Sequence, residues 1–234
     1  MAMDVLVTGA NRGIGLEFAR QLLQRGDRVV ATCRHPGKAA LLNTLAGSHP
    51  GRLHVLPLDV ADAKSRAELA RELPLVLGED GRLDVIINNA GVLHPGERFG
   101  RVEQAVLEDS LRTNAIGPFL LAQALAPLLA DGGRIANLSS ELGSIGGNTR
   151  FGTPSYDISK AAQNMASVLL ARALAGRGIV VLALHPGWVQ TEMGGAGAQI
   201  ATADAVAGLL RVIQDATPAQ TGAFLDWRGQ PLPW

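Results

Sequence analysis

Short apolar runs alternate along this chain with longer segments of helical periodicity, and turn residues separate most of them. The short runs are rich in Val, Ile and Leu on both faces, which is typical of parallel strands covered by helices on each side. We predict strands at Val5–Thr8, Arg28–Thr32, Leu53–Leu58, Asp84–Asn88, Arg134–Ser139, Val180–Leu184 and Ala223–Asp226. We predict helices at Gly15–Gln24, Lys38–Leu45, Ala63–Leu73, Val102–Leu129, Ser155–Leu174 and Ala203–Ile213. This order predicts an α/β fold, a single Rossmann-type doubly wound parallel sheet of about seven strands with helices on both faces.

The length favours one domain. A chain of 234 residues can bury one large α/β core but is short for two. Two Gly/Pro-rich stretches, at about 141–154 and 187–200, each follow a predicted strand. They therefore lie at the carboxyl edge of the sheet, where such folds bind ligands. We interpret them as substrate loops, and we expect residues 1–234 to form a single domain.

Composition narrows the classes of partner. Apolar residues make up 47% of the chain and charged residues 18%, which is typical of a globular protein. The 21 basic and 21 acidic residues cancel, and no Lys/Arg run stands out, so we expect no nucleic-acid partner. The five histidines show no paired ligand spacing, and we expect no metal.

The same features bear on location. The single cysteine, Cys33, excludes an internal disulfide and fits a reducing compartment. The start of the chain lacks the features of a secretion signal, and the apolar stretches end well short of the roughly 18 residues that a membrane span needs. We therefore expect a cytoplasmic protein with no membrane partner.

A glycine-rich turn follows the first predicted strand. Thr8-Gly9-Ala10-Asn11-Arg12-Gly13-Ile14-Gly15 leads directly into a helical pattern. Gly9 allows a sharp turn, Gly13 allows backbone to approach a pyrophosphate, and Gly15 lets the helix pack close to the strand. The free N–H groups and positive dipole end of the helix favour an anion. The turn predicts dinucleotide binding; a glycine-rich turn that binds nothing is the alternative.

The end of the second strand indicates which dinucleotide. NAD-binding sheets carry an acidic residue near this point, whereas here Cys33 and Arg34 follow the strand. Arg34 and Arg12 could grip a 2′-phosphate with charge-assisted hydrogen bonds. We therefore expect NADP(H) as the preferred cofactor and NAD(H) as the alternative. Two solvated surface arginines would give the same sequence.

Candidate catalytic residues lie further along. Tyr156 and Lys160 are four residues apart on a predicted helix, which puts both side chains on one face. A nearby ammonium lowers the pKa of a tyrosine, whose ordinary value near 10 hinders proton transfer at neutral pH. An ordinary surface pair would have the same spacing. Ser139 and Ser140 end a predicted strand at the ligand edge, where a hydroxyl could hold a carbonyl oxygen or cap a turn. Asn114 lies in the interior of a predicted helix, where asparagine is mildly unfavourable, so we expect its side chain to serve a polar network rather than to stabilise the helix.

Taken together, these motifs resemble the short-chain dehydrogenase/reductase family, colinearly over nearly the whole chain. Thr8–Gly15 resembles its glycine-rich turn, Leu58-Asp59-Val60 its adenine-contacting segment, and Asn88-Asn89-Ala90-Gly91 its N-N-A-G signature. Asn114, Ser140, Tyr156 and Lys160 follow the order of its catalytic tetrad, and Pro186–Thr191 resembles the P-G-x-v-x-T segment beside the nicotinamide.

The resemblance implies an NADP(H)-dependent oxidoreductase that moves a hydride between nicotinamide and a carbonyl or alcohol carbon. Tyr156 would be the general acid or base, Lys160 would lower its pKa and hold the ribose, Ser140 would orient the carbonyl, and Asn114 would anchor a water relay. The implied cofactor contacts are Gly9, Asn11, Arg12, Gly13, Ile14, Gly15, Arg34, Asp59, Val60, Asn88, Ala90, Gly91, Tyr156, Lys160, Pro186, Gly187, Val189 and Thr191.

The interval between Ser140 and Tyr156 is longer than the family usually has, and with the short chain it resembles the C-factor and Sniffer-type carbonyl reductases. Leu142, Ile145, Trp188 and Met193 are candidates for an apolar substrate wall, although each could belong to the core. The family packs two of its long helices in dimers, which implies a homodimer or homotetramer. A dinucleotide-binding signalling or sensor protein with little turnover is the alternative function.

Overall fold

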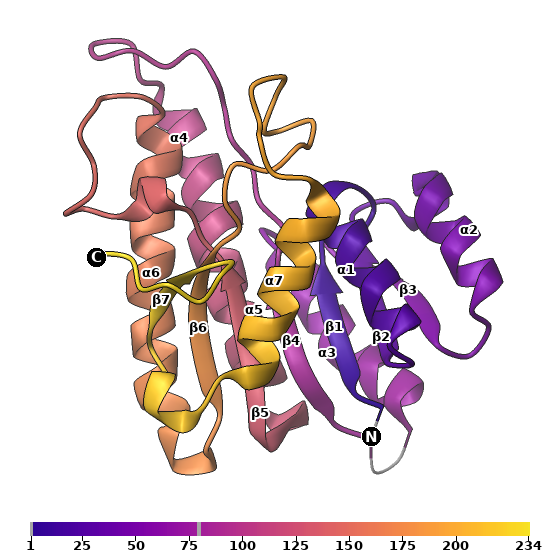
Figure 1. The fold of residues 1–234 in the computed structure, drawn as a ribbon. Helices are drawn as coiled ribbons and strands as arrows, with labels where there is room; N and C mark the ends of the chain where they lie inside the picture. The colour runs from indigo at the N-terminus through magenta and orange to yellow at the C-terminus, as the bar shows by residue number, and fades with distance from the viewer. Residues whose placement is uncertain (1, 79–80) are drawn as a thin grey trace.

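A single parallel sheet organises the molecule (Figure 1). The computed structural model describes residues 2–78 and 81–234, and within them seven strands form the sheet in the order β3-β2-β1-β4-β5-β6-β7. Every neighbouring pair is parallel. The strands are β1 (Asp4–Thr8), β2 (Arg28–Cys33), β3 (Leu53–Pro57), β4 (Leu83–Asn88), β5 (Leu129–Leu138), β6 (Val180–His185) and β7 (Phe224–Asp226). The order reverses between β1 and β4, which confirms the doubly wound fold predicted from the sequence.

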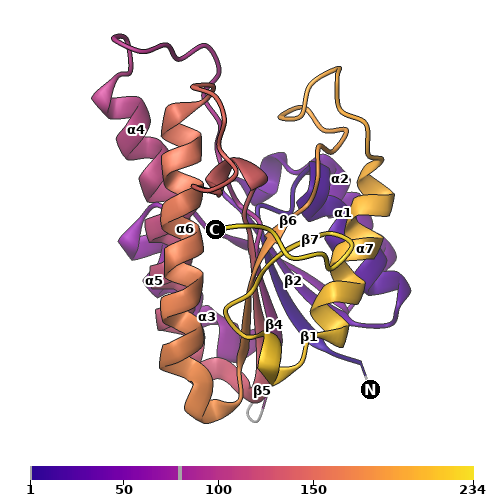
Figure 2. The same ribbon diagram turned by 60° about the vertical axis from the view of Figure 1, so that its left-hand side comes forward.

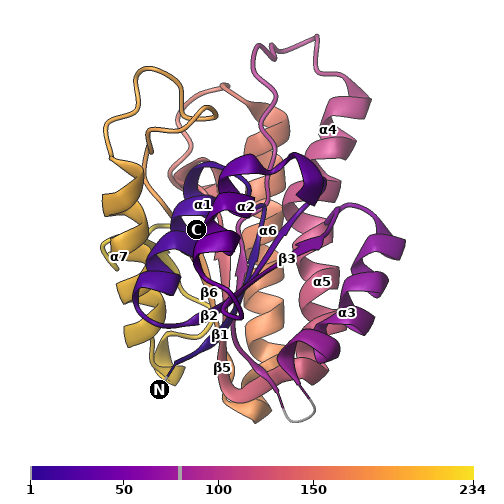
Figure 3. The ribbon, with the colours of Figure 1, turned by 90° about the vertical axis from the view of Figure 1, so that its right-hand side faces the viewer.

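Helices cover both faces of the sheet (Figure 2). One layer contains α1 (Gly13–Gln24), α2 (Ala40–Ser48) and α7 (Thr202–Asp215). The opposite layer contains α3 (Ala63–Leu77), α5 (Gly117–Leu125) and α6 (Pro154–Leu174), with α4 (Gln104–Leu111) packed on α6. In the side view, α3 and α5 lie on one side of the strands and α7 on the other (Figure 3). Among the described residues, no helix combines the length and the apolarity that crossing a membrane requires.

Alternate strand residues feed the two cores. In β1, Val5 and Val7 pack with the α1 and α7 layer, whereas Leu6 packs with the layer of α3, α5 and α6. These three side chains are fully buried, because both faces of the strand are covered. Burying a side chain of this size stabilises the fold by about 1.5–3 kcal/mol. The apolar runs of the sequence are therefore explained by burial on two faces.

The long helix predicted at Val102–Leu129 is wrong in its extent. Helix α4 begins at Gln104, a π-helical turn at Arg112–Ile116 separates it from α5, and Leu129 already belongs to β5. Pro118 has no N–H to give to the carbonyl of Asn114, so a regular α-helical ladder cannot continue through this point. Close packing adds to the effect, because a Cβ at Gly117 would lie 2.6 Å from the carbonyl oxygen of Val60.

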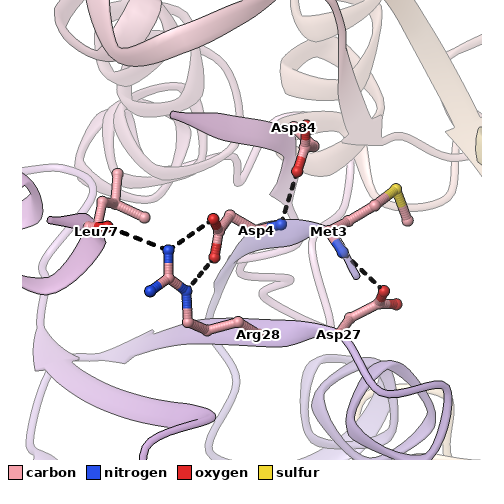
Figure 4. Close-up of polar contacts among 6 residues, drawn as sticks. All are labelled: Met3, Asp4, Asp27, Arg28, Leu77 and Asp84. Atoms are coloured by element: carbon pink, nitrogen blue, oxygen red, sulfur yellow. Dashed lines mark hydrogen bonds and ion pairs between the residues drawn. The ribbon is translucent and has the colours of Figure 1, made fainter. Parts of the chain in front are cut away.

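A polar network joins three strands at the amino edge of the sheet (Figure 4). The backbone N–H of Asp4 donates to the Asp84 carboxylate (2.8 Å), which links β1 to β4. Arg28 on β2 pairs with the Asp4 carboxylate and also donates to the Leu77 carbonyl at the end of α3 (3.2 Å). The Asp4 carboxylate raises the pKa of Arg28 through this hydrogen bond, although burial opposes the rise. These contacts hold the strands in register at the edge opposite the carboxyl ends.

Candidate active site

A cavity of about 1080 Å³ opens at the carboxyl ends of the strands. Its lining includes most of the residues singled out from the sequence: Gly9, Asn11, Arg12, Gly13, Ile14, Arg34, Asp59, Val60, Ala90, Gly91, Ser140, Leu142, Tyr156, Lys160, Pro186, Gly187, Trp188, Val189, Thr191 and Met193. Four of the predicted residues are not part of the lining: Gly15, Asn88, Asn114 and Ile145. The topology therefore brings the glycine-rich turn and the Tyr156–Lys160 pair into one site.

Close contacts with neighbouring backbone require glycine at two positions of the glycine-rich turn, Gly9 and Gly15. Gly9 has φ +65°, and a Cβ there would lie 2.9 Å from Cα of Ala90. Gly13 has φ +55° and begins α1, two residues before the start predicted from the sequence. A Cβ at Gly15 would lie 2.3 Å from the carbonyl oxygen of Gly9, so no larger residue fits under the turn. The N–H groups of the first turn of α1 are thus brought close to the cavity, as anion binding requires.

Asn89 fastens this turn to β4. Its side-chain amide donates to the carbonyl oxygens of Thr8 (2.9 Å) and Gly9 (3.1 Å). In return, the Thr8 hydroxyl accepts from the backbone N–H groups of Asn89 and Ala90, both at 3.0 Å. Asn89 was not among the site residues selected from the sequence, although it belongs to the quoted Asn-Asn-Ala-Gly motif. That motif was the signal for it.

The two arginines proposed for the phosphate differ in their surroundings. Arg12 forms an ion pair with Glu192, a residue of the loop that follows β6. Both side chains are exposed and line the cavity, so the pair bridges the turn and the loop. Arg34 is the first residue after β2 and lies in the same lining, with His35 and Lys38 nearby. The end of β2 thus presents basic side chains and no carboxylate to the cavity.

Tyr156 lies in the first turn of α6, which a carboxylate stabilises. Glu97 accepts from the backbone N–H (3.2 Å) and the hydroxyl (2.5 Å) of Ser155, immediately before Tyr156. Pro154 begins the helix, a position at which a missing N–H costs nothing. The anchor comes from the loop after β4, so it ties the start of α6 to that loop.

The phenol of Tyr156 has an unfavourable environment for its charged form. Burial raises its pKa to about 12, a hydrogen bond from the Ser140 side chain opposes that rise, and the charge of Asp157 adds to it. The Lys160 Nζ atom lies 5.5 Å from the centre of the tyrosine ring. The phenol is therefore a proton donor in this state, and a nearby positive charge would lower its pKa and make it a more effective base.

Lys160 is buried, with 4% of its surface exposed. Its Nζ atom donates to the carbonyl oxygen of Leu138 (2.6 Å) and to Oε1 of Gln163 (2.9 Å). Burial lowers its pKa to about 7, because the ammonium loses its water shell. The sequence pattern placed Lys160 beside Tyr156 but gave no sign of these two acceptors.

The two serines at the end of β5 have different partners. The Ser139 hydroxyl donates to Oδ1 of Asn164 (2.6 Å). The Ser140 hydroxyl accepts from the N–H of Leu142 (3.2 Å) and caps a 3₁₀ turn at Glu141–Gly143. Since the hydroxyl hydrogen of Ser139 is used on Asn164, the geometry favours Ser140 as the donor toward the cavity.

Asn114 is a structural link inside the π-helical turn. It is fully buried, and its side chain exchanges two hydrogen bonds with the backbone of Val92, at 2.8 and 2.9 Å. Its amide also donates to the Ser159 hydroxyl on α6 (2.9 Å). The side chain therefore ties the segment after β4 to α6, the helix of Tyr156 and Lys160, and serves the polar network expected from the sequence.

His185 is a site residue that the sequence reasoning missed. It ends β6, and its Nδ1 atom accepts from the backbone N–H of Glu141 (3.2 Å), next to Ser140. Burial lowers its pKa, and the charges of Glu141 and Asp226 oppose that shift. A histidine directly after an apolar strand, at the edge that binds ligands, was the available signal.

The apolar wall is only partly as predicted. Leu142, Trp188 and Met193 line the cavity, whereas Ile145 is 81% exposed and lies outside the lining. The indole N–H of Trp188 donates to the Gly194 carbonyl (2.8 Å), which holds the ring against its own loop. Among the described residues, no group of three or more His, Cys, Asp or Glu side chains could hold a metal ion.

A doubly wound sheet with a glycine-rich turn, and with a tyrosine, a lysine and a serine around the adjoining cavity, defines a dinucleotide-dependent oxidoreductase. The model of the short chain dehydrogenase family matches residues 4–199. The chain belongs to this family.

Similar proteins are known in sequence and in structure. The chain is 42% identical over 156 residues to "C-signal" of Myxococcus xanthus, covering 66% of this chain and 94% of that protein. It is 35% identical over 235 residues to the 1-hydroxy-2-glutathionyl-2-methyl-3-butene dehydrogenase of a Rhodococcus species, covering 98% and 99%. Among solved structures, NADPH-bound carbonyl reductase from chicken fatty liver has TM-score 0.94 and 36% identity, covering 100% and 99%. The carbonyl reductase Sniffer of D. melanogaster has TM-score 0.95 and 34% identity, covering 100% of both chains.

Proposed function

We propose that this protein is an NADP(H)-dependent oxidoreductase of the carbonyl reductase type, with Tyr156 as its general acid and base. The observation that carries the proposal is the meeting of Ser140, Tyr156 and Lys160 in the cavity that begins at the glycine-rich turn. The similarity to an NADPH-bound carbonyl reductase over the whole chain supports it.

The residues around the cavity fit a dinucleotide with a 2′-phosphate. The glycine-rich turn leaves room only for backbone, and the start of α1 offers N–H groups to a pyrophosphate. Arg34 and Lys38 at the end of β2 supply positive charge where an NAD-binding protein would carry a carboxylate. Arg12 would exchange Glu192 for the phosphate. These groups favour NADP(H), with NAD(H) as the weaker alternative.

The chain's own residues would perform the proton chemistry. A bound nicotinamide supplies or receives the hydride. The Ser140 hydroxyl would donate to the carbonyl oxygen and stabilise its developing charge. Tyr156 would give its phenolic proton to that oxygen in reduction and remove it in oxidation. The Lys160 ammonium would stabilise the phenolate and bring the pKa of Tyr156 down from about 12.

The remaining expectations from the sequence stay predictions. They are the single catalytic domain, the water relay at Asn114, the cytoplasmic location, the homodimer or homotetramer, and the cofactor contacts. The predicted contacts are Gly9, Asn11, Arg12, Gly13, Ile14, Gly15, Arg34, Asp59, Val60, Asn88, Ala90, Gly91, Tyr156, Lys160, Pro186, Gly187, Val189 and Thr191. Leu142, Trp188 and Met193 would face an apolar carbonyl or alcohol substrate, because they are the apolar candidates in the cavity lining.

A signalling or sensor protein with little turnover is the second candidate. The 42% identity to "C-signal" of Myxococcus xanthus favours it. A protein that only senses a dinucleotide needs the glycine-rich turn but has no need of a tyrosine and a lysine around the substrate space. The two candidates therefore predict the same cofactor binding and different turnover.

The deciding experiment follows NADPH absorbance with a panel of aldehydes, ketones and quinones. The control is Tyr156→Phe, which keeps the ring and removes the proton. We expect turnover by the native protein with at least one carbonyl, loss of that turnover in the variant, and equal NADPH binding by fluorescence titration in both. Tight NADPH binding without turnover on any carbonyl would favour the sensor.

A further inference from the structure

Gln163 is a buried amide next to the proposed catalytic lysine. It lies three residues after Lys160 on α6 and is 1% exposed. Its Oε1 atom accepts from Lys160 Nζ at 2.9 Å. Its Nε2 atom is buried and has no hydrogen-bond partner within residues 2–78 and 81–234. A buried donor without a partner is unfavourable, so this amide has to be explained.

Packing alone does not explain a glutamine here. Methionine has a similar length and volume and would bury no unpartnered N–H group. What the amide provides and methionine does not is the oxygen that meets the lysine. That oxygen matters more for an ammonium than for a neutral amine, since hydrogen bonds to charged groups are roughly twice as strong.

The surroundings of Lys160 leave it few other stabilising groups. The carbonyl oxygen of Leu138 is its second acceptor, at 2.6 Å. In the described part of the chain, the carboxylates around the cavity and the first turn of α6 have other partners. Glu141 faces His185, Glu192 pairs with Arg12, Asp109 contacts His94, Asp59 accepts from Ala61 N–H, and Asp157 accepts from Thr153 and Asn148. Tyr156, on the same helix, lies with its ring centre 5.5 Å from Lys160 Nζ.

We propose that Gln163 is a positioning residue that holds the Lys160 ammonium in its charged form and fixes it against β5, beside Tyr156. Two of the three N–H groups of the ammonium are then satisfied from the β5 and α6 side, by Leu138 and Gln163. The third remains for the cavity. This inference rests on the proposed function for its catalytic meaning, but the contact between Gln163 and Lys160 can be tested without turnover.

The test compares Gln163→Met with Gln163→Glu, using Ser110→Ala as a matched control. Ser110 is also buried with an unpartnered polar atom among the described residues, but it lies on α4 and outside the cavity lining. Methionine keeps the shape and loses the oxygen. Glutamate keeps an oxygen and adds a charge that favours the ammonium.

The first readout is cofactor-free unfolding by urea at acid and alkaline pH. Loss of the acceptor penalises the charged lysine more than the neutral amine. We compare the folding equilibrium constant of each variant with that of native protein at the same pH. For Gln163→Met, this ratio should be about tenfold lower at acid pH than at alkaline pH, which corresponds to one hydrogen bond to a charged group. For Gln163→Glu, the same ratio should be higher at acid pH than at alkaline pH. Ser110→Ala should shift stability equally at both pH values.

The second readout is the pH profile of alcohol oxidation, with an alcohol whose carbonyl form is a substrate. Oxidation needs the phenolate of Tyr156, which the ammonium stabilises. The acid limb of the profile should therefore move to higher pH by about one unit in Gln163→Met and stay in place in Ser110→Ala.

The outcomes separate the two proposals. If stability changes equally at both pH values and the acid limb stays in place, Gln163 is a packing residue and the inference is wrong. If the stability signature is present but no carbonyl or alcohol is turned over, Gln163 holds the ammonium as inferred and the proposed enzymatic function is what fails. If Gln163→Met does not fold, Gln163→Leu takes its place in both readouts, because leucine also removes the oxygen that meets Lys160.

Discussion

Replacing Lys160 by methionine should make the cofactor-free protein more stable at acid pH than at alkaline pH, relative to native protein. Burial lowers the pKa of Lys160 from its ordinary 10.5 to about 7, so the folded state disfavours the ammonium. Methionine keeps the length of the aliphatic side chain and removes the charge. The variant therefore escapes a cost that the native protein bears whenever Lys160 is protonated.

The size and pH window of the effect follow from that shift. A fall from 10.5 to about 7 corresponds to about 5 kcal/mol, at about 1.4 kcal/mol per pKa unit. Below about pH 7 the lysine is protonated in both states and the full cost is present. The cost falls as the pH rises, because the folded protein releases the proton first, and it is gone above 10.5. Between about pH 6 and pH 9 the native protein should gain about 3 kcal/mol relative to the variant.

Urea unfolding of both proteins at about pH 6 and pH 9 measures this difference, since all other titrating groups are shared. Lys64→Met is the control. The Lys64 side chain is 83% exposed, and its only described ion pair is with Glu68 on the helix surface (3.8 Å). The control should track native protein at both pH values. A gap between native protein and Lys160→Met that stays constant from acid to alkaline pH would show that burial does not disfavour the ammonium, and the reasoning would be refuted.

Four further outcomes are expected. Tyr156→Phe should lower turnover by about 1000-fold, as expected for loss of a general acid, while the NADPH dissociation constant stays within about twofold; near-native turnover would remove the tyrosine from the mechanism. Arg34→Asp should weaken NADPH binding by about tenfold or more and favour NADH; an unchanged ratio of the two dissociation constants would show that Arg34 does not contact the phosphate. Gly15→Ala should weaken NADPH binding in fluorescence titration, because its Cβ would lie 2.3 Å from the Gly9 carbonyl, while Gly47→Ala, with nothing within 4 Å, should bind normally; equal binding by both would contradict the close approach. Arg28→Met should lower the free energy of unfolding by about 1–3 kcal/mol without changing cofactor affinity, since its partners lie at the amino edge; a stability equal to that of native protein would mean that the ion pair in Figure 4 contributes nothing.

The sheet could be predicted from the sequence because its signal is local. Val5, Leu6 and Val7 are all apolar, and a strand buried on both faces needs that pattern. The helix break at Arg112–Ile116 was harder, since helical periodicity continues through it. Gly117 and Pro118 are visible in the sequence as residues that disfavour a helix interior. The approach of Gly117 to the Val60 carbonyl, however, depends on tertiary packing.

In the site, too, local features could be predicted from the sequence, and contacts between distant segments could not. Tyr156 and Lys160 could be paired from their spacing, because one helical turn separates them. Arg12 was predicted to contact phosphate, yet in this structure it pairs with Glu192, which is 180 residues away in the chain. Asn89 and His185 were missed for a similar reason, because their hydrogen bonds join different strands and loops. Periodicity carries no information about such partners.

The two ends of the sheet show why the site could be located from sequence while its energetics could not. At the amino edge, Arg28 meets the Asp4 carboxylate, so a charge is balanced by an opposite charge. At the carboxyl edge, Lys160 is buried, and within residues 2–78 and 81–234 its acceptors are the neutral oxygens of Leu138 and Gln163, which do not balance its charge. Burying an ammonium without a counter-ion costs folding free energy. Because no carboxylate neutralises it, however, its positive field can act on the Tyr156 phenol. A carboxylate in place of the Gln163 amide would stabilise Lys160 and weaken that field. If Gln163 holds the ammonium as inferred above, its neutral oxygen favours the charged form of Lys160 without neutralising the charge that would act on the tyrosine.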